Sequence, residues 1–467
     1  MPGDGGPATG GPGEELTVTG GLLLTMAPGS GAPVSGWMTV AADGRIRAMG
    51  TGPAPATGGR VLDASGCLVA PGFVSAHSHL FTSGSRGLGT DQGLYGWIDA
   101  MTRYTRAADP DDMYWLTLHG ALDFLANGIT TAYDFTASRL TFSAAADGSG
   151  TYGGAVRPPA LVESQLVAKV DAGIRFVHSI MLDEAWTDGT SAAIDQAEQN
   201  LAFADGYRDH PGYLGSAISG GVQWALGPEL AVAEATVMHR HGLVNQPHFL
   251  ESPFEVAAQQ ERFDWYRRAG ALGPTLVFGH FIHTTPGIVA DAAAAGCAMV
   301  WQPASNGRLG SGVADIPAYR AAGMRVGVGL DDQACSDVAD PWQNMRFGLY
   351  LLRATAKDAT VLGVRDMLWL HTMGSAEVLG LADQVGSLQV GKWADFVVVD
   401  PRRPDTGPLW DPYGTYVLAC SLRNLHQVYV GGRLVSEDGR LVAVDGPAVS
   451  KEVHHRLESI RSRVDAT

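Results

Sequence analysis

Apolar and polar positions follow one pattern at both ends of this chain and another in its middle. At the ends, short apolar runs are separated by glycine turns, a pattern typical of antiparallel strands. These runs lie at 17–19, 37–41, 45–49, 60–63, 394–400 and 428–435. The pattern predicts one small β-sandwich domain that combines residues 15–70 with residues 384–450.

In the middle, apolar runs of strand length alternate with segments of helical periodicity. The expected strands lie at 67–79, 128–135, 173–183, 214–224, 243–251, 276–283, 298–305 and 325–332. The expected helices lie at 111–127, 191–208, 229–241, 255–269 and 285–295. Eight strand–helix units within residues 71–383 predict an α/β fold, a closed parallel (β/α)8 TIM barrel. We expect residues 1–14 to be disordered and residues 451–467 to form a C-terminal helix or tail.

Composition narrows the class of protein. The chain has 467 residues, of which 45% are hydrophobic and 17% are charged, as in globular proteins. The net charge of −16 argues against non-specific binding to nucleic acid or an anionic membrane but does not indicate a cationic substrate. The partner expected from the candidate catalytic residues below is a small-molecule substrate. The first basic residue is Arg45, so a signal peptide is not expected. Four cysteines without a CxxC motif indicate reduced thiols and a cytoplasmic protein.

Two histidines stand at the end of the first expected barrel strand. His77 and His79 are two residues apart, so on a strand they face the same side and can bind one metal ion such as zinc. His248 with Glu251, His280 and Asp331 each follow a strand of their own. Since the carboxyl ends of barrel strands form one face, we expect these side chains to meet there.

These residue types suit one catalytic divalent metal ion. His77, His79 and His248 offer nitrogen ligands and Asp331 a carboxylate, a set that favours Zn²⁺, with Fe²⁺, Co²⁺ or Mn²⁺ as alternatives. Such an ion lowers the pKa of bound water to about 7. His280 and Asp331 are candidate bases for the water proton, and Glu251 can protonate the substrate or shuttle that proton. None of the four lysines ends a strand, so a bridging carboxylated lysine is not expected and a mononuclear site is favoured.

Several further residues have a functional and a structural interpretation. His239 and His241 also form an HxH pair, but on an expected helix they diverge by roughly 200° and belong to the surface. Cys335 lies near Asp331, and a buried, inert thiol is the favoured interpretation. His283 is interpreted either as a residue that supports the site from behind or as a structural one. The candidates for substrate contacts, with core packing as the alternative for the tryptophans, are His178, Gln223, Trp224, Trp301 and Asn306.

Six segments together carry a family resemblance that covers nearly the whole chain. They are 71–79, 248–251, 279–283, 305–312, 328–332 and 391–400. The chain resembles the amidohydrolase superfamily, and within it the cytosine deaminase and chlorohydrolase-like branch. The resemblance implies a distorted (β/α)8 barrel with a composite β-sandwich, one divalent metal on the four ligands above, and a homo-oligomer. It also implies that His280 and Asp331 orient and deprotonate the water and that Glu251 handles the proton on a substrate ring nitrogen.

Two segments depart from the family pattern. Relatives that act on adenosine-like thioethers carry a histidine in the loop after strand four, and residues 221–228 lack it. This departure argues against a nucleoside substrate. After strand eight, Asp332 adds a second acid to which no role is assigned.

Three functions are compatible with these residues. The first is hydrolytic deamination of an amino-substituted heterocycle, which suits water attack at an amidine-like carbon with proton delivery to the ring. The second is hydrolysis of an amide, urea, carbamate, thiocarbamate or carbon–chlorine bond in a small aromatic compound, as in phenylurea and molinate hydrolases. The third is a non-catalytic barrel that binds or assembles with other proteins, which the complete ligand set disfavours.

Overall fold

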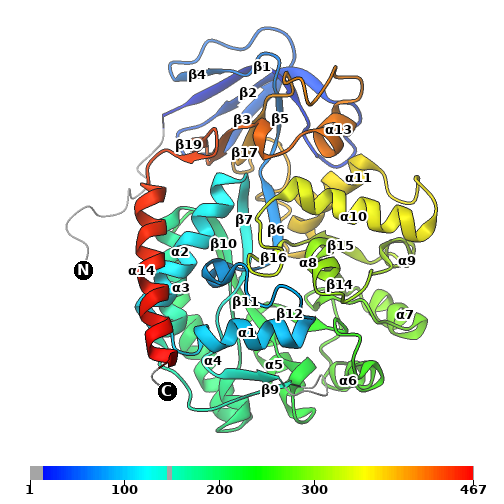
Figure 1. Ribbon diagram of the computed structural model, residues 1–467. Coiled ribbons are helices and arrows are strands. Elements are labelled where there is room, and N and C mark those ends of the chain that lie inside the picture. The colour runs from blue at the N-terminus through cyan, green and yellow to red at the C-terminus, as the bar shows by residue number, and fades with distance from the viewer. Residues whose placement is uncertain (1–13, 145–149, 466–467) are drawn as a thin grey trace.

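The computed structural model describes residues 14–144 and 150–465, so all but one residue of the expected disordered tail lie outside it. Its two large sheets are stacked along the long axis of the molecule (Figure 1). One contains strands from both ends of the chain and the other contains the barrel strands. The fold is a distorted (β/α)8 barrel with an extra β domain built from the two chain ends. The barrel and the contribution of both chain ends to the second domain were expected from the sequence.

The β domain is a single nine-stranded sheet in the order β20-β19-β18-β17-β5-β1-β2-β3, with β4 paired to β1. Its strands are β1 (Leu16–Leu23), β2 (Val34–Val40), β3 (Ile46–Gly50), β4 (Arg60–Asp63), β5 (Leu68–Pro71), β17 (Phe396–Val399), β18 (Leu425–Val430), β19 (Arg433–Glu437) and β20 (Arg440–Leu441). The two chain ends meet where β5 pairs antiparallel with β17. Buried Val18, Met38, Phe396 and Tyr429 contribute to a core of its own.

The barrel strands pair in parallel in the order β15-β14-β13-β12-β11-β10-β7-β6-β16. They are β6 (Phe73–His79), β7 (Ile129–Phe135), β10 (Arg175–Ile180), β11 (Tyr213–Gly220), β12 (Val244–Phe249), β13 (Val277–His280), β14 (Ala298–Trp301), β15 (Arg325–Val328) and β16 (Asp331–Asp332). The eighth strand is divided, because β15 pairs with β14 while its continuation β16 pairs with β6. This division closes the ring and places Asp331 beside the end of β6.

One expected strand is divided as well. The apolar run 67–79 was expected to form a single strand, but β5 belongs to the β domain and β6 to the barrel. The break falls at Gly72, whose N–H donates to the carbonyl of Asp395 next to β17. The break could not be predicted, because the residues on both sides of it are buried and the sequence remains apolar across it.

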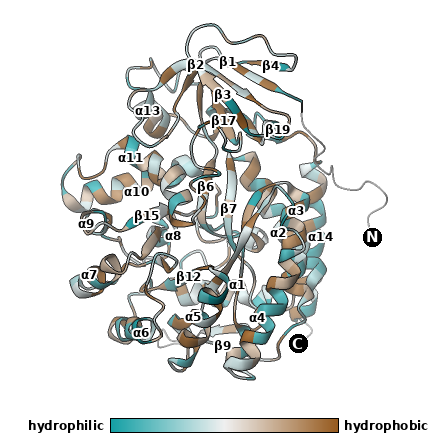
Figure 2. Cartoon of the chain, turned by 180° about the vertical axis from the view of Figure 1, so that it is seen from behind, coloured by the Kyte–Doolittle hydropathy of each residue, from teal (hydrophilic) through white to brown (hydrophobic). Residues whose placement is uncertain are grey.

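Helices surround the barrel (Figure 1). They are α1 (Leu94–Thr105), α2 (Pro110–Ala126), α3 (Ala160–Ala172), α4 (Thr190–Asp205), α5 (Glu229–His241), α6 (Val256–Arg268), α7 (Pro286–Ala294), α8 (Pro303–Arg308), α9 (Ile316–Ala321), α10 (Pro341–Ala356), α11 (Val364–Trp369), α12 (Ser375–Val378), α13 (Pro412–Gly414) and α14 (Gly446–Asp465). The five helices expected from the sequence correspond to α2, α4, α5, α6 and α7. Hydrophilic residues mark the outer helices α6 and α14 in Figure 2.

Two elements absent from the sequence prediction stand near the site. They are α1 and the hairpin of β8 (Thr141–Ala144) and β9 (Gly150–Gly153). Short one-turn segments complete the fold: η1 (Leu80–Ser85), η2 (Asp183–Trp186), η3 (Val222–Trp224), η4 (Leu370–Gly374), η5 (Thr415–Ala419) and η6 (Leu422–Asn424). Among the described helices, none combines the length and the apolar character that crossing a membrane requires.

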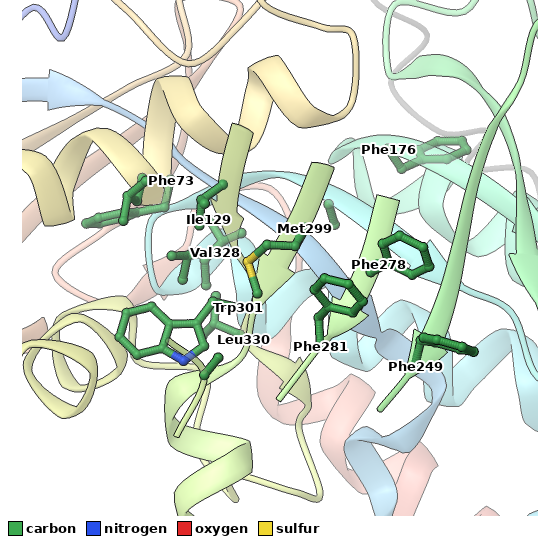
Figure 3. Packing of buried hydrophobic residues seen from close by; sticks show 14 of the residues in the cluster. Phe73, Ile129, Phe176, Phe249, Phe278, Phe281, Met299, Trp301, Val328 and Leu330 are labelled. Carbon is green, nitrogen blue, oxygen red and sulfur yellow. The ribbon is translucent and has the colours of Figure 1, made fainter. Parts of the chain in front are cut away.

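Barrel strands divide their side chains between two apolar layers. Between strands and helices pack Phe176, Phe249, Phe278, Met299, Trp301 and Val328, which Figure 3 shows as one group. Alternate residues of the same strands, including Val74, Tyr133, Val177, Val277 and Val300, form a separate cluster inside the barrel. The position of a residue within this alternation decides whether it can reach the barrel interior, where the site lies.

Candidate active site

The expected metal ligands meet at the carboxyl ends of the barrel strands. The Nε2 atom of His79 lies 3.1 Å from Nε2 of His248 and 3.4 Å from Nε2 of His77. Oδ1 of Asp331 lies 3.3 Å from Nε2 of His77 and 3.5 Å from Nε2 of His79. Four residues that are up to 254 positions apart in the sequence therefore present their lone pairs to one point.

A register irregularity turns the histidines inward. The pairing of β6 with β7 shifts between Ser75 and Ser78. His77 within this shift and His79 just after it both face Phe135 inside the barrel. Irregularities of this kind often re-aim side chains next to active sites. The backbone at the ends of two barrel strands is also unusual, because His280 and Asp331 both have a φ of 65°. Such left-handed conformations in residues other than glycine cost free energy and concentrate at functional sites.

The donor set fits a divalent cation. Burial lowers the pKa of His79 and of His280 to about 3, so both imidazoles are neutral, the form that ligates metals. Imidazole nitrogens at hydrogen-bond distance from one another cannot all carry protons, and nitrogen with carboxylate ligands suits zinc. The ligand atoms of His77, His248, His280 and Asp331 lie within 4.8 Å of one another, as do those of His79, Asp331 and Asp332. The residues present therefore fit the metal that the sequence predicts.

Gln246 orients one ligand and was missed by the sequence prediction. Its Oε1 lies 2.6 Å from Nδ1 of His77, so Nδ1–H donates to it and Nε2 is left bare for a metal. Its own amide nitrogen donates to the carbonyl of Ala76. Its position in the sequence could have indicated this role, since Gln246 stands two residues before His248 and therefore on the same face of β12.

His280 and Glu251 form the proton-handling part of the site. Nδ1 of His280 lies 2.8 Å from the amide nitrogen of Asn306, which donates to it. This leaves Nε2 to face Glu251 Oε2 at 3.5 Å and Asp331 Oδ2 at 3.9 Å. Burial raises the pKa of Glu251 well above its usual range, and the Asp331 carboxylate adds to this effect. Glu251 is thus held as a proton donor beside the ligands.

A largely apolar cavity opens over these residues. Its wall includes Leu94, Trp97 and Met101 of α1, Phe142 and Tyr152 of the β8–β9 hairpin, and Trp224. The Trp224 ring lies 5.5 Å from Phe142, 5.9 Å from Tyr152 and 5.7 Å from His248, measured between ring centroids. Arg106 and Arg157 also line the cavity. The arrangement suits a flat ring with its reacting carbon at the metal end.

A family model matches most of the chain and thereby identifies its family. The amidohydrolase family model matches residues 68–435. The chain belongs to the amidohydrolase family. Its members are metal-dependent hydrolases, and this amidohydrolase is accordingly an enzyme that acts on carbon–nitrogen bonds. The family resemblance expected from the sequence is confirmed.

Relatives of this amidohydrolase carry deaminase names. An enzyme named 5-methylthioadenosine/S-adenosylhomocysteine deaminase from Syntrophobacter fumaroxidans is 26% identical over 458 residues, which cover 96% of this chain and 98% of the relative. An enzyme of the same name from Pelotomaculum thermopropionicum is 26% identical over 451 residues, covering 96% and 99%.

Solved structures share the fold. An adenosine deaminase from Xanthomonas campestris with bound zinc superposes with a TM-score of 0.82 at 22% identity, covering 96% of this chain and 98% of that one. An atrazine chlorohydrolase from Arthrobacter aurescens TC1 complexed with zinc gives a TM-score of 0.79 at 21% identity, covering 95% and 100%.

Two residues expected at the substrate lie elsewhere in this amidohydrolase. Trp301 is buried in the layer between strands and helices, where its ring packs against Gly348 of α10 (Figure 3). His178 shares its strand face with Phe176 and Ile180 of the same layer, and its Nδ1 lies 2.9 Å from Nζ of Lys169. For Trp301 this is the core-packing alternative. The expectation for His178 overlooked the alternation along β10, which points its side chain away from the barrel interior.

The other substrate candidates stand closer to the site. Trp224 lines the cavity directly. Gln223 is buried behind it, where its Oε1 accepts from the N–H of Leu250 at 3.3 Å. Asn306 contacts His280 rather than the cavity.

Asp332, Cys335 and His283 lie close to the site. Asp332 lines the cavity, with its Oδ2 3.8 Å from Nε2 of His79 and 3.7 Å from Sγ of Cys335. Burial and the Asp332 carboxylate raise the pKa of the Cys335 thiol well above its usual range, which matches an inert thiol at the cavity wall. Nε2 of His283 lies 2.9 Å from the carbonyl of Ser311, a structural contact. His239 and His241 are exposed on α5.

Glu234 is a buried carboxyl that holds the Trp224 turn in place. It accepts hydrogen bonds from the N–H of Gly221 at 2.7 Å, from the Asn245 side chain at 2.9 Å and from the Tyr266 hydroxyl at 3.2 Å. Burial nevertheless raises the pKa of Glu234 to about 7. The folded protein therefore retains a proton here that the unfolded chain releases near pH 4.5.

This proton gives a pH dependence with a defined sign. As pH rises from about 4.5 to about 7, the free energy of unfolding should fall, because the folded state binds more protons than the unfolded state. The shift corresponds to about 3 kcal/mol. We expect Glu234→Gln to remove this part of the slope and to be more stable than the wild type above about pH 7. Urea unfolding of both metal-loaded proteins over a pH series measures the free energy of unfolding at each pH. The same pH dependence of this free energy in both proteins would refute the role given to Glu234.

Proposed function

We propose that this amidohydrolase is a mononuclear, zinc-dependent deaminase that replaces an amino group of a heterocycle by hydroxyl. The observation that carries this proposal is the buried Glu251 carboxyl, 3.5 Å from His280 and beside the ligand cluster. Attack of water at a ring carbon next to a nitrogen requires a proton donor for that nitrogen, and a protonated carboxyl at this position can be that donor. The deaminase names of the relatives support the same reaction.

The chain's own residues perform the proton transfers. His77, His79, His248 and Asp331 would hold the metal, which lowers the pKa of bound water toward neutrality and so supplies a nucleophile. Asp331, oriented by its contact with His280, accepts the proton of the attacking water. Glu251 donates its proton to the ring nitrogen as the carbon–oxygen bond forms. The amino group then takes up the proton that Asp331 accepted from the water and leaves as ammonia as its bond to the ring carbon breaks. Glu251 takes back the ring-nitrogen proton, so both carboxyl groups return to their starting states.

The cavity favours a compact, flat substrate. Trp224 and the hairpin aromatics offer ring faces, and Arg106 and Arg157 favour a neutral or anionic molecule over a cation. The loop 221–228 lacks the histidine that relatives acting on adenosine-like thioethers carry after strand four, which argues for a substrate other than a nucleoside. We also propose a cytoplasmic protein without nucleic-acid or membrane partners, on the basis of the net charge of −16 and the four free, buried cysteines. The proposal of a homo-oligomer rests on the family resemblance alone.

A second candidate function uses the same nucleophile on another bond. The apolar cavity wall also suits hydrolysis of an aromatic amide, urea, carbamate, thiocarbamate or carbon–chlorine bond. The fold shared with an atrazine chlorohydrolase is compatible with it.

Product identity separates the two candidates. Zinc-loaded protein is incubated with amino-heterocycles, ureas, carbamates, anilides and chloroheterocycles, and the products are identified by mass spectrometry. Exchange of an amino group for hydroxyl supports deamination. Cleavage into two fragments, or loss of chloride, supports the second candidate instead, and a zinc-loaded protein that converts none of these classes would refute both.

Removing the Trp224 ring should weaken substrate binding. We expect Trp224→Ala to raise KM for the best heterocycle by roughly three- to tenfold, because one aromatic contact is lost while the proton-transfer groups stay in place. Steady-state kinetics measure KM and kcat separately. Trp410→Ala is the matched control, because Trp410 is 90% exposed on the β domain side of the molecule. Equal effects of the two substitutions would contradict the role given to Trp224.

A further inference from the structure

Lys169 is a lysine buried behind the active site. It lies on α3 and its side chain is fully shielded from solvent. Its Nζ is 2.5 Å from Oδ2 of Asp134 on β7 and 2.9 Å from Nδ1 of His178 on β10. The ring of Phe176 covers it at 5.1 Å. A buried lysine is costly to desolvate, so this pair calls for an explanation beyond packing.

The second oxygen of Asp134 reaches the metal-binding strand. Oδ1 of Asp134 accepts a hydrogen bond of 2.9 Å from the N–H of Leu80. Leu80 directly follows His79 and begins η1, whose first turn has no capping side chain of its own. Asp134 therefore supplies from a neighbouring strand the acceptor that this turn lacks, at the residue next to a metal ligand.

The three groups satisfy one another electrostatically. Burial lowers the pKa of His178 well below its usual range, so its neutral Nδ1 accepts a hydrogen bond from the Lys169 ammonium. The ammonium in turn compensates the Asp134 carboxylate. An apolar pair of similar volume would stabilise a barrel as well or better, since buried ion pairs gain little net free energy. What an apolar pair would lack is a directed acceptor for Leu80.

We propose that Lys169 and Asp134 are positioning residues for the metal ligand His79. Lys169 fixes the Asp134 carboxylate, and Asp134 fixes the chain at Leu80 and thereby the direction of the His79 ring. His178 completes this buried network instead of contacting substrate. The inference rests on the proposed metal role of His79, but it makes a prediction about metal affinity that does not depend on the substrate.

Two double variants isolate the hydrogen bond to Leu80. In both, Lys169→Met removes the buried charge. Asp134→Asn then keeps an oxygen that can accept from Leu80, whereas Asp134→Leu has nearly the same volume and no acceptor. Comparing these two proteins leaves the loss of the ion pair constant. Asp134→Ala in the Lys169→Met background repeats the comparison with a smaller side chain if the leucine variant fails to fold.

Metal affinity and stability are measured on the same samples. Competition with a chelator gives the zinc dissociation constant, the absorption spectrum of the cobalt form reports ligand geometry, and thermal unfolding of the metal-free form reports stability. We expect the variant with leucine to bind zinc roughly 10- to 100-fold more weakly than the variant with asparagine, with an altered cobalt spectrum and similar metal-free Tm.

The outcomes separate this inference from the proposed function. Equal zinc affinities and cobalt spectra in the two variants would overturn the positioning role. An affinity loss that only parallels a loss of metal-free Tm would also overturn it, because that is the signature of a structural role. A wild-type protein that binds no zinc would instead refute the proposed metal-dependent function.

Discussion

Replacing Glu251 by glutamine should lower kcat by roughly 10²- to 10⁴-fold while the zinc content stays unchanged. The amide has the size of the carboxyl but cannot carry its proton to the ring nitrogen. Glu251 lies 3.5 Å from His280 and is not among the predicted metal ligands, so binding of the metal should be preserved. Steady-state kinetics on the best heterocycle, together with metal analysis, measure both quantities.

Glu255→Gln is the matched control, because Glu255 is exposed at the start of α6, four residues away. It should retain full activity. Turnover of Glu251→Gln at the wild-type rate would contradict the role of Glu251. Loss of zinc in this variant would show that Glu251 acts through the metal site rather than through proton transfer.

Replacing His248 by alanine should abolish both zinc binding and turnover. The imidazole supplies one of the converging nitrogens, 3.1 Å from Nε2 of His79, and alanine leaves the remaining ligands with an incomplete set. Loss of an outer-sphere partner alone costs about 10- to 100-fold in metal affinity, so loss of a ligand should cost more. We expect kcat/KM to fall by about 10³-fold or more, because a bound metal lowers the activation barrier by several kcal/mol. Chelator competition and kinetics measure the two effects.

His239→Ala provides the control for His248→Ala. His239 belongs to the second HxH pair of the chain and is exposed on α5. This variant should bind zinc and turn over substrate as the wild type does. If the two variants keep equal zinc affinity, His248 is not a ligand and the proposed site is wrong.

The parts of the site that the sequence could predict are those with a short-range signature. The pair His77 and His79 sits two residues apart after an apolar run, and His248, His280 and Asp331 each follow a run of their own. The barrel then brings these strand ends together because all its strands run parallel. The five expected helices could be predicted for the same reason, because their periodicity of apolar residues is visible within each segment.

The parts that escaped prediction depend on contacts between distant segments. Gln246, Lys169 and Asp134 carry no motif, and only the packed strands and α3 show what they touch. The positions of His178 and Trp301 could not be decided from the sequence, because a strand end does not reveal which of its two faces turns inward. The cavity wall formed by α1 and the β8–β9 hairpin lies in segments between barrel strands, where a barrel pattern predicts no extra element.

Hydrolytic deamination is tested by product stoichiometry in water labelled with the heavy oxygen isotope. The zinc-loaded enzyme is allowed to convert its best heterocycle, and mass spectrometry of the product is combined with a quantitative ammonia assay. We expect each product molecule to gain one labelled oxygen on the ring and ammonia to form in equal amount. A labelled product without ammonia, or two fragments of the substrate, would contradict deamination.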